Sequence, residues 1–130
     1  MSRIARSGVA YWAVIFALGF VLGTVRSLWG AEALGEARFI LIEVPVILLA
    51  SFAAARWLTW HFAIASAGAA AAMGAIALTL LMLAEVALTA VLGNSVTQWI
   101  AGLTEPPGLY GFLGQIVFGL MPLLVRPRAE

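Results

Sequence analysis

The sequence contains no cysteine, no lysine and no aspartate, and it has a single histidine. Without cysteine there can be no disulfide bond, no thiolate nucleophile and no zinc–thiolate site. The basic side chains are all arginines, and together with the glutamates they leave a net charge of +1. A nucleic-acid-binding surface needs a dense basic stripe, so the sequence predicts no nucleic-acid partner. Thiol chemistry and nucleic-acid binding are therefore excluded at the outset.

Charged residues are scarce because apolar residues dominate the chain. Hydrophobic residues make up 64% of the sequence, compared with about 45–50% in soluble domains. This composition indicates an integral membrane protein whose main partner is the lipid bilayer. A length of 130 residues with no long polar linker predicts one transmembrane domain over residues 1–130.

Four apolar segments are long enough to cross a bilayer, which takes about 20 residues per helix. Their ranges are about 8–29, 39–59, 62–92 and 109–125, and the third is long enough to tilt or to begin nearer Ser66. Pro45 and Pro122 lie inside these segments. Membrane helices tolerate such prolines where a neighbour bonds the freed carbonyl. The predicted fold is all-α, an integral membrane four-helix bundle.

The first segment also has features of a secretory signal. Arg3 and Arg6 precede its apolar run, and a small-residue Ala-Glu-Ala sequence follows at 31–33. However, the run is longer than the roughly 7–15 apolar residues of a signal peptide, and Arg26 interrupts its end. We therefore expect a retained first helix.

The arginines are distributed unequally between the two ends of the predicted bundle. With four spans both termini lie at one end, and arginine-rich ends face the cytoplasm. The end with the termini carries Arg3, Arg6, Arg56, Arg126 and Arg128, and the other end carries Arg26 and Arg38. This asymmetry predicts a multi-pass protein of a cell inner membrane with both termini in the cytoplasm.

Short connections and interfacial aromatic residues complete the predicted topology. Residues 30–38 are predicted to form a short outer loop, and Trp60-His61 a tight inner turn. Aromatic residues near the helix ends fit the belts found at membrane interfaces. They are Tyr11, Trp12, Trp57 and Trp60 on the cytoplasmic side, and Trp29, Trp99 and Tyr110 on the outer side.

The longest connection, residues 93–108, contains a helix-start signal. Ser95 and Gln98 have the spacing of a capping box, and apolar residues follow them. We expect a short amphipathic helix on the outer interface. Pro106 and Pro107 would end it and open the fourth long helix.

Each predicted helix carries one charged or amide side chain in its outer half. A charge in a bilayer core costs several kcal/mol, so such residues normally face a bundle interior and pair. At about 1.5 Å per residue, all four fall in the outer half of the bundle. They are Arg26, Glu43, Glu85 and Gln115, and Arg38 lies above them at the edge of the second helix. We predict that they form one buried network.

Glycines lie on the helix faces that carry these polar residues. Small residues let membrane helices approach closely. Gly19 and Gly23 share a face with Arg26, Gly74 with Glu85, and Gly111 and Gly119 with Gln115. We expect these glycines to form the packing seam beside the polar network.

The network has two main interpretations, and a third places these side chains against lipid or a partner protein. As a structural element, it fixes helix register in a non-enzymatic accessory or assembly subunit, which would pair with other membrane subunits or form a homodimer. As a functional element, Glu43 and Glu85 would titrate in a small proton-coupled transporter or channel. Polar residues that would continue a proton path across the inner half are sparse, and this favours the structural interpretation.

The sequence contains no motif for catalysis or cofactor binding. The only histidine, His61, could ligate the metal of a porphyrin or chlorophyll, but its position beside Trp60 fits a solvated interfacial residue better. No serine has a histidine or lysine placed to activate it. We expect no enzyme activity, no metal site and no cofactor.

Four short segments carry a resemblance: GTVR at 23–26, LIEVP at 41–45, LAE at 83–85 and LMPLL at 120–124. Together they resemble a family of small bacterial inner-membrane proteins with four spans and no assigned activity. The resemblance implies the architecture and no catalytic role. Small multidrug transporters are similar in size, but their membrane glutamate lies in the first helix, where this chain has Arg26. Fluoride channels have a pore asparagine and paired phenylalanines without a match here.

Overall fold

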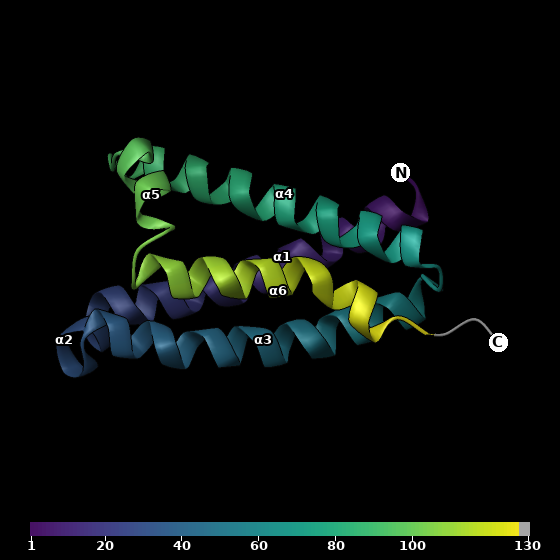
Figure 1. The fold of residues 1–130 in the computed structure, drawn as a ribbon, viewed down its shortest axis with the longest axis horizontal. Helices are drawn as coiled ribbons and strands as arrows, with labels where there is room; N and C mark the ends of the chain where they lie inside the picture. Colours follow the sequence, from purple (N-terminus) through teal and green to yellow (C-terminus); the bar gives the residue numbers. More distant parts are fainter. Residues whose placement is uncertain (128–130) are drawn as a thin grey trace.

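The computed structural model describes residues 1–127, and this part of the chain contains helices and turns but no strand (Figure 1). Four helices are long and apolar enough to cross a membrane, which confirms the prediction of four long apolar helices. The elements are α1 (Arg3–Val25), the π-helical segment η1 (Arg26–Gly30), α2 (Ala31–Leu34), α3 (Glu36–His61), α4 (Ala67–Val91), α5 (Val96–Gly102) and α6 (Gly108–Val125). Arg128, one of the residues behind the predicted orientation, lies outside the described range.

Serine caps set three of the helix starts. Ser2, Ser66 and Ser95 precede α1, α4 and α5, and each side chain accepts a hydrogen bond from the backbone N–H three residues later. Such caps satisfy backbone donors that have no partner in the first helical turn. The third span therefore begins at Ala67 rather than at residue 62. The capped helix α5 confirms the short helix predicted within residues 93–108.

The predicted outer loop over residues 30–38 is wrong. The first helix continues through η1 and α2 to Leu34, and only Gly35 interrupts the chain before α3 begins at Glu36. Gly35 has a φ of 87°, a conformation that glycine adopts without strain. A methyl group on Gly30 would collide with the ring of Phe39, so the small residue allows this close helical turn.

The predicted turn at Trp60-His61 is also misplaced. Helix α3 continues through His61, and the chain reverses over residues 62–66. Ala63 lies in the left-handed region with a φ of 54°. The His61 ring stacks on the Trp57 ring of the same helix, with 4.7 Å between centroids.

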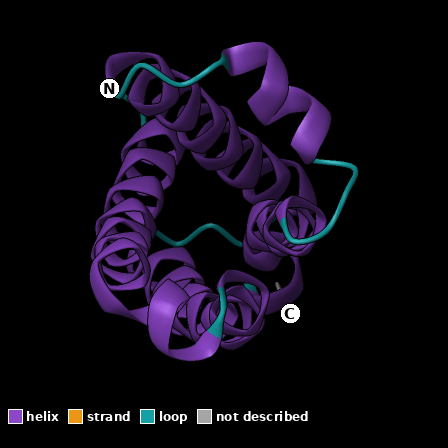
Figure 2. Cartoon of the chain, turned by 90° about the vertical axis from the view of Figure 1, so that its left-hand side faces the viewer, coloured by secondary structure: helices purple, strands orange, loops and turns teal. Residues whose placement is uncertain are grey.

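The four long helices form a ring when viewed along the bundle (Figure 2). Helices α1 and α6 each pack against α3 and α4, so α1 faces α6 across the ring, and α3 faces α4. Helix α1 begins and α6 ends at the same end, which we call the termini end (Figure 1). The opposite end carries α2 and α5, and we call it the α5 end.

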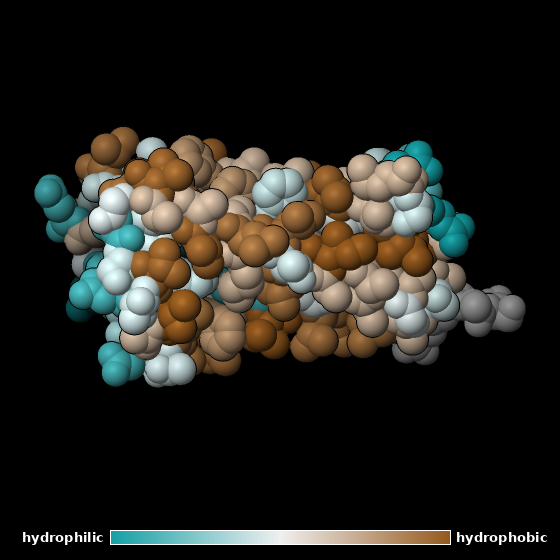
Figure 3. Space-filling model, turned by 90° about the horizontal axis from the view of Figure 1, so that it is seen from above, coloured by the Kyte–Doolittle hydropathy of each residue, from teal (hydrophilic) through white to brown (hydrophobic). Residues whose placement is uncertain are grey.

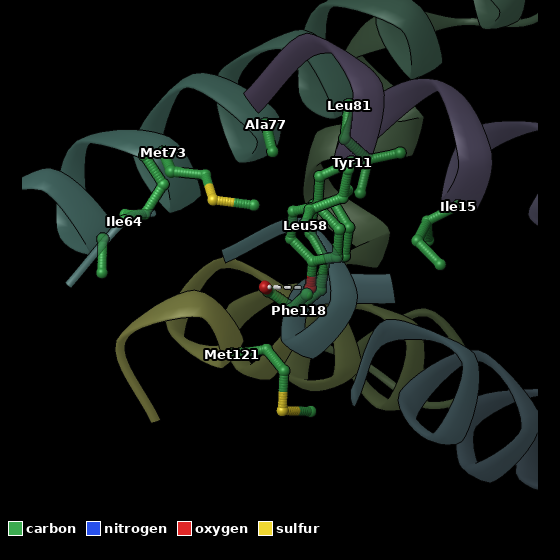
Figure 4. Packing of buried hydrophobic residues seen from close by; sticks show 11 residues of the cluster. Tyr11, Ile15, Leu58, Ile64, Met73, Ala77, Leu81, Phe118 and Met121 are labelled. Carbon is green, nitrogen blue, oxygen red and sulfur yellow. Dashed lines mark hydrogen bonds between the residues drawn. The ribbon is translucent and has the colours of Figure 1, made fainter. Parts of the chain in front are cut away.

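The tightest packing lies in the half of the bundle near the termini end (Figure 4). A methyl group on Gly74 would collide with the carbonyl oxygen of Gly119, so α4 and α6 touch backbone to backbone. The buried cluster comprises Tyr11, Ile15, Ala55, Leu58, Ile64, Ala70, Met73, Ala77, Leu81, Phe118 and Met121. Tyr11 is 0% exposed, which corrects its assignment to an interfacial belt.

The face of the molecule in Figure 3 has an apolar middle and more polar ends. Large apolar side chains such as Leu49, Leu83 and Leu124 are exposed on the helices. A contiguous exposed apolar surface of this extent marks contact with lipid or with another protein. It agrees with four helices of membrane-spanning length and composition.

Candidate functional site

Arg26 and Glu43 form an ion pair between η1 and α3. Arg26 Nη1 donates to Glu43 Oε1 over 2.6 Å, and the two side chains are 28% and 14% exposed. The π-helical turn begins at Arg26 itself, so the helix register changes at the ion pair. Single π turns are frequent at functional sites. The structure thus brings together two of the residues that the sequence placed in one layer.

Glu85 and Gln115 form a second pair, between α4 and α6. Gln115 Nε2 donates to Glu85 Oε1 over 2.6 Å. The other amide atom, Gln115 Oε1, is buried and accepts no hydrogen bond from residues 1–127. Among residues 1–127 no hydrogen bond joins this pair to Arg26 or Glu43. The four polar side chains therefore form two pairs, each linking two neighbouring helices.

Both pairs line one cavity of about 880 Å³ in the half of the bundle near the α5 end. The cavity begins among the residues around α5 and reaches down to Ile15, Leu81 and Phe118, which form its floor. Its walls include the aromatic residues Phe16, Phe20, Trp99 and Phe112. A mostly apolar cavity with a few convergent polar groups is the usual character of a ligand site.

Tyr11 lies beneath the floor and ties α1 to α6 across the ring (Figure 4). Its ring stacks on Phe118 with 4.3 Å between centroids, and its O–H donates to the Phe118 carbonyl over 2.7 Å. That carbonyl lacks its helical donor, because the residue four positions on is Pro122, which has no N–H. The Tyr11 hydroxyl therefore replaces a missing backbone hydrogen bond. The sequence indicated that such a partner was needed, but not that Tyr11 provides it.

The predicted glycine seam divides into two groups. Gly74 and Gly119 mediate close helix contact, as expected. The other three glycines do not bring helices into close contact but line the cavity; they are Gly19, Gly23 and Gly111. A methyl group on Gly111 would meet no described atom within 4 Å. Their missing side chains leave space in the cavity instead of bringing helices together.

Two further candidates lie away from this group. Arg38 is exposed and does not line the cavity, so the structure does not bring it to the polar pairs. His61 is exposed at the termini end, beside Trp57. Within residues 1–127, no group of three histidine or acidic side chains is placed to hold a metal ion. Glu36 and Glu105 line the cavity near its mouth, and the sequence analysis did not predict this. Neither residue belongs to a sequence motif that indicates a binding site.

No protein-family model, curated protein or solved structure matches the chain. The resemblance to small four-span bacterial membrane proteins therefore stays a prediction. What the protein does has to be inferred from the geometry of the polar pairs, the cavity and its floor.

Proposed function

We propose that the protein is a non-enzymatic subunit of a bacterial inner membrane with an accessory or assembly role. The observation that carries this proposal is the confinement of the membrane-embedded polar pairs to one half of the bundle, above a packed apolar floor. Arg26–Glu43 links η1 to α3, and Glu85–Gln115 links α4 to α6. Each pair joins neighbours in the ring, which is what a structural role requires. Its partners would be the bilayer and other membrane proteins, or a second copy of the chain.

The second candidate is a small proton-coupled transporter or channel with Glu43 and Glu85 as titrating groups. The cavity that reaches both carboxyl groups favours it. The cavity floor of Ile15, Leu81 and Phe118 argues against a transporter or channel, because a proton path would have to pass through these apolar side chains. The structural role is therefore the better supported of the two.

Proton flux separates the two candidates. Proteoliposomes containing the wild-type protein are expected to show no proton flux above protein-free vesicles, because the side chains that form the floor, Ile15, Leu81 and Phe118, are apolar. Glu85→Gln is expected to fold with a loss of about 1 kcal/mol or less, since the new amide still bonds to Gln115. Glu32→Gln, which removes an exposed carboxylate, is the matched control. If the wild type conducts protons and a stable Glu85→Gln protein does not, the transporter is the correct function.

We also propose that the termini end faces the cytoplasm. Arg3, Arg6, Arg56 and Arg126 support this orientation, since they lie at that end. The chain has no cysteine, so a single introduced thiol reports one position. We expect a membrane-impermeant maleimide to label Thr97→Cys in spheroplasts, and Ala67→Cys only after permeabilisation. The unmodified protein is the control, and labelling of Ala67→Cys in intact spheroplasts would refute the orientation.

A further inference from the structure

The α5 end of the bundle carries an excess of negative charge. Five carboxyl groups lie at or near it against two guanidinium groups, and the five are Glu32, Glu36, Glu43, Glu85 and Glu105. Within residues 1–127 only Glu43 makes an ion pair, and its partner is Arg26. The three carboxyl groups of Glu36, Glu85 and Glu105 line the cavity without a cationic partner in this range. A cavity with low-dielectric walls and charges of one sign attracts ions of the opposite sign.

The walls of the cavity suit an apolar body beside a positive charge. Helices on opposite sides of the bundle supply aromatic side chains to the cavity. Phe16 and Phe20 belong to α1, and Phe112 belongs to α6. The face of an aromatic ring attracts cations, most strongly in a desolvated site. The volume of about 880 Å³ lies within the range of small-molecule sites. The cavity is therefore large enough for a ligand with one or two aromatic rings.

The polar groups of the inner cavity that remain free to bind a ligand are hydrogen-bond acceptors rather than donors. Gln115 donates to Glu85, and this leaves its own Oε1 buried without a donor. The second carboxyl oxygen of Glu85 accepts no hydrogen bond from the described residues. Among the described residues, Arg26 is the only cation that lines the cavity, and it is already paired with Glu43. A ligand that fits these groups carries N–H donors and a positive charge.

We propose that this cavity binds a small amphipathic amine in its protonated form, admitted from the α5 end. The ammonium group lies beside Glu85 and Gln115 and donates to the free oxygens of both. The apolar part of the ligand packs against the aromatic walls. This binding site goes beyond the proposed structural role and does not depend on proton transport.

Binding is measured by calorimetry on the full chain in phosphatidylcholine nanodiscs at pH 7, with the heat of empty nanodiscs subtracted. The probe is dibenzylamine, which is cationic at this pH. Dibenzyl ether is its neutral counterpart and diphenylacetate an anion of similar size. We expect saturable binding of the amine and none of the ether or the anion. Equal binding of the ether, or preferential binding of the anion, would overturn the proposal.

Three variants test the location of the site. Glu85→Gln is expected to weaken amine binding about ten- to hundredfold, the loss of a hydrogen bond to a charged group. Glu32→Gln removes the same charge from an exposed position outside the cavity and should leave the affinity unchanged. Gly111→Leu fills space inside the cavity without meeting a neighbour at Cβ, and should abolish binding while the protein stays folded. Equal losses in both glutamate variants, or full binding by Gly111→Leu, would place the amine elsewhere.

The amino group of phosphatidylethanolamine has the same chemistry as the proposed ligand. Nanodiscs that contain this lipid distinguish the two sources, because a bound headgroup would compete with dibenzylamine. We expect the affinity for dibenzylamine to be the same with and without it, since the site takes a free amine. A lower affinity in its presence would reassign the cavity to the lipid and refute the free-amine ligand.

Discussion

Replacing Arg26 with alanine is expected to cost about 3 kcal/mol of unfolding free energy. The change would leave the Glu43 carboxyl group, 14% exposed, without its cation inside a helix that is long and apolar enough to span a membrane. Breaking a buried ion pair typically costs about 3–5 kcal/mol, and the 28% exposure of the Arg26 side chain favours the lower end. The measurement is reversible unfolding in mixed micelles by titration with a denaturing detergent.

A double-mutant cycle tests whether the pair itself causes this loss. Arg26→Ala, Glu43→Ala and the double variant are expected to show a coupling energy of at least about 0.5 kcal/mol. Arg38→Ala removes an exposed arginine at the same end and should change stability by less than about 0.5 kcal/mol. Strictly additive losses for Arg26 and Glu43 would mean that the two side chains do not pair in the membrane.

Tyr11→Phe is expected to destabilise the protein by about 1–3 kcal/mol, although it removes a single hydroxyl group. The Phe118 carbonyl would be left buried with no donor, and a buried polar group without a partner costs about this much. The ring stacking on Phe118 would remain, so the loss reports the contacts of the hydroxyl group, which reaches Ser51 as well as the carbonyl. Unfolding in mixed micelles measures it. Tyr110→Phe removes a tyrosine hydroxyl that makes no hydrogen bond within residues 1–127 and serves as the control.

The same hydrogen bond predicts a rescue. Pro122→Ala supplies a backbone N–H four residues after Phe118, so the carbonyl regains a donor within α6. The cost of Tyr11→Phe should then fall by about 1 kcal/mol when it is measured in the Pro122→Ala background. If the cost is the same in both backgrounds, the Tyr11 hydroxyl is not compensating for the proline.

The sequence was enough to predict the helical class and the four long helices. The length and hydropathy of an apolar segment are local properties, so they can be read without knowing the neighbours of the segment. The serine caps and the short helix after Ser95 are local in the same way. Residues 30–38 were predicted to form a loop, whereas the first helix continues to Leu34. Hydropathy does not distinguish a polar loop from a polar helical turn. The residues over 31–34 are good helix formers, and Gly35 alone breaks the chain.

Helical depth and face also identified the polar residues of the bundle interior, but not their partners. Arg26, Glu43, Glu85 and Gln115 lie at similar depths, so depth alone allows any pairing among them. Which neighbours pair follows from the side-chain contacts, because α1 and α6 each pack against both α3 and α4 in the order of helices around the ring. That order depends on side-chain packing between helices, including the contact of Gly74 with Gly119, and no local pattern encodes it.

The cavity is the feature that only the tertiary structure decided. The sequence pattern of a glycine on an inward helix face does not show whether the glycine brings two helices together or leaves space between them. Gly119 does the first and Gly111 the second, because α4 and α6 touch near the termini end, whereas space opens between the helices near the α5 end. Composition and periodicity thus predicted four helices of membrane-spanning length and composition with polar groups on their inward faces. The distances between helices, which arise from long-range packing, decided that those groups surround a space large enough for a ligand.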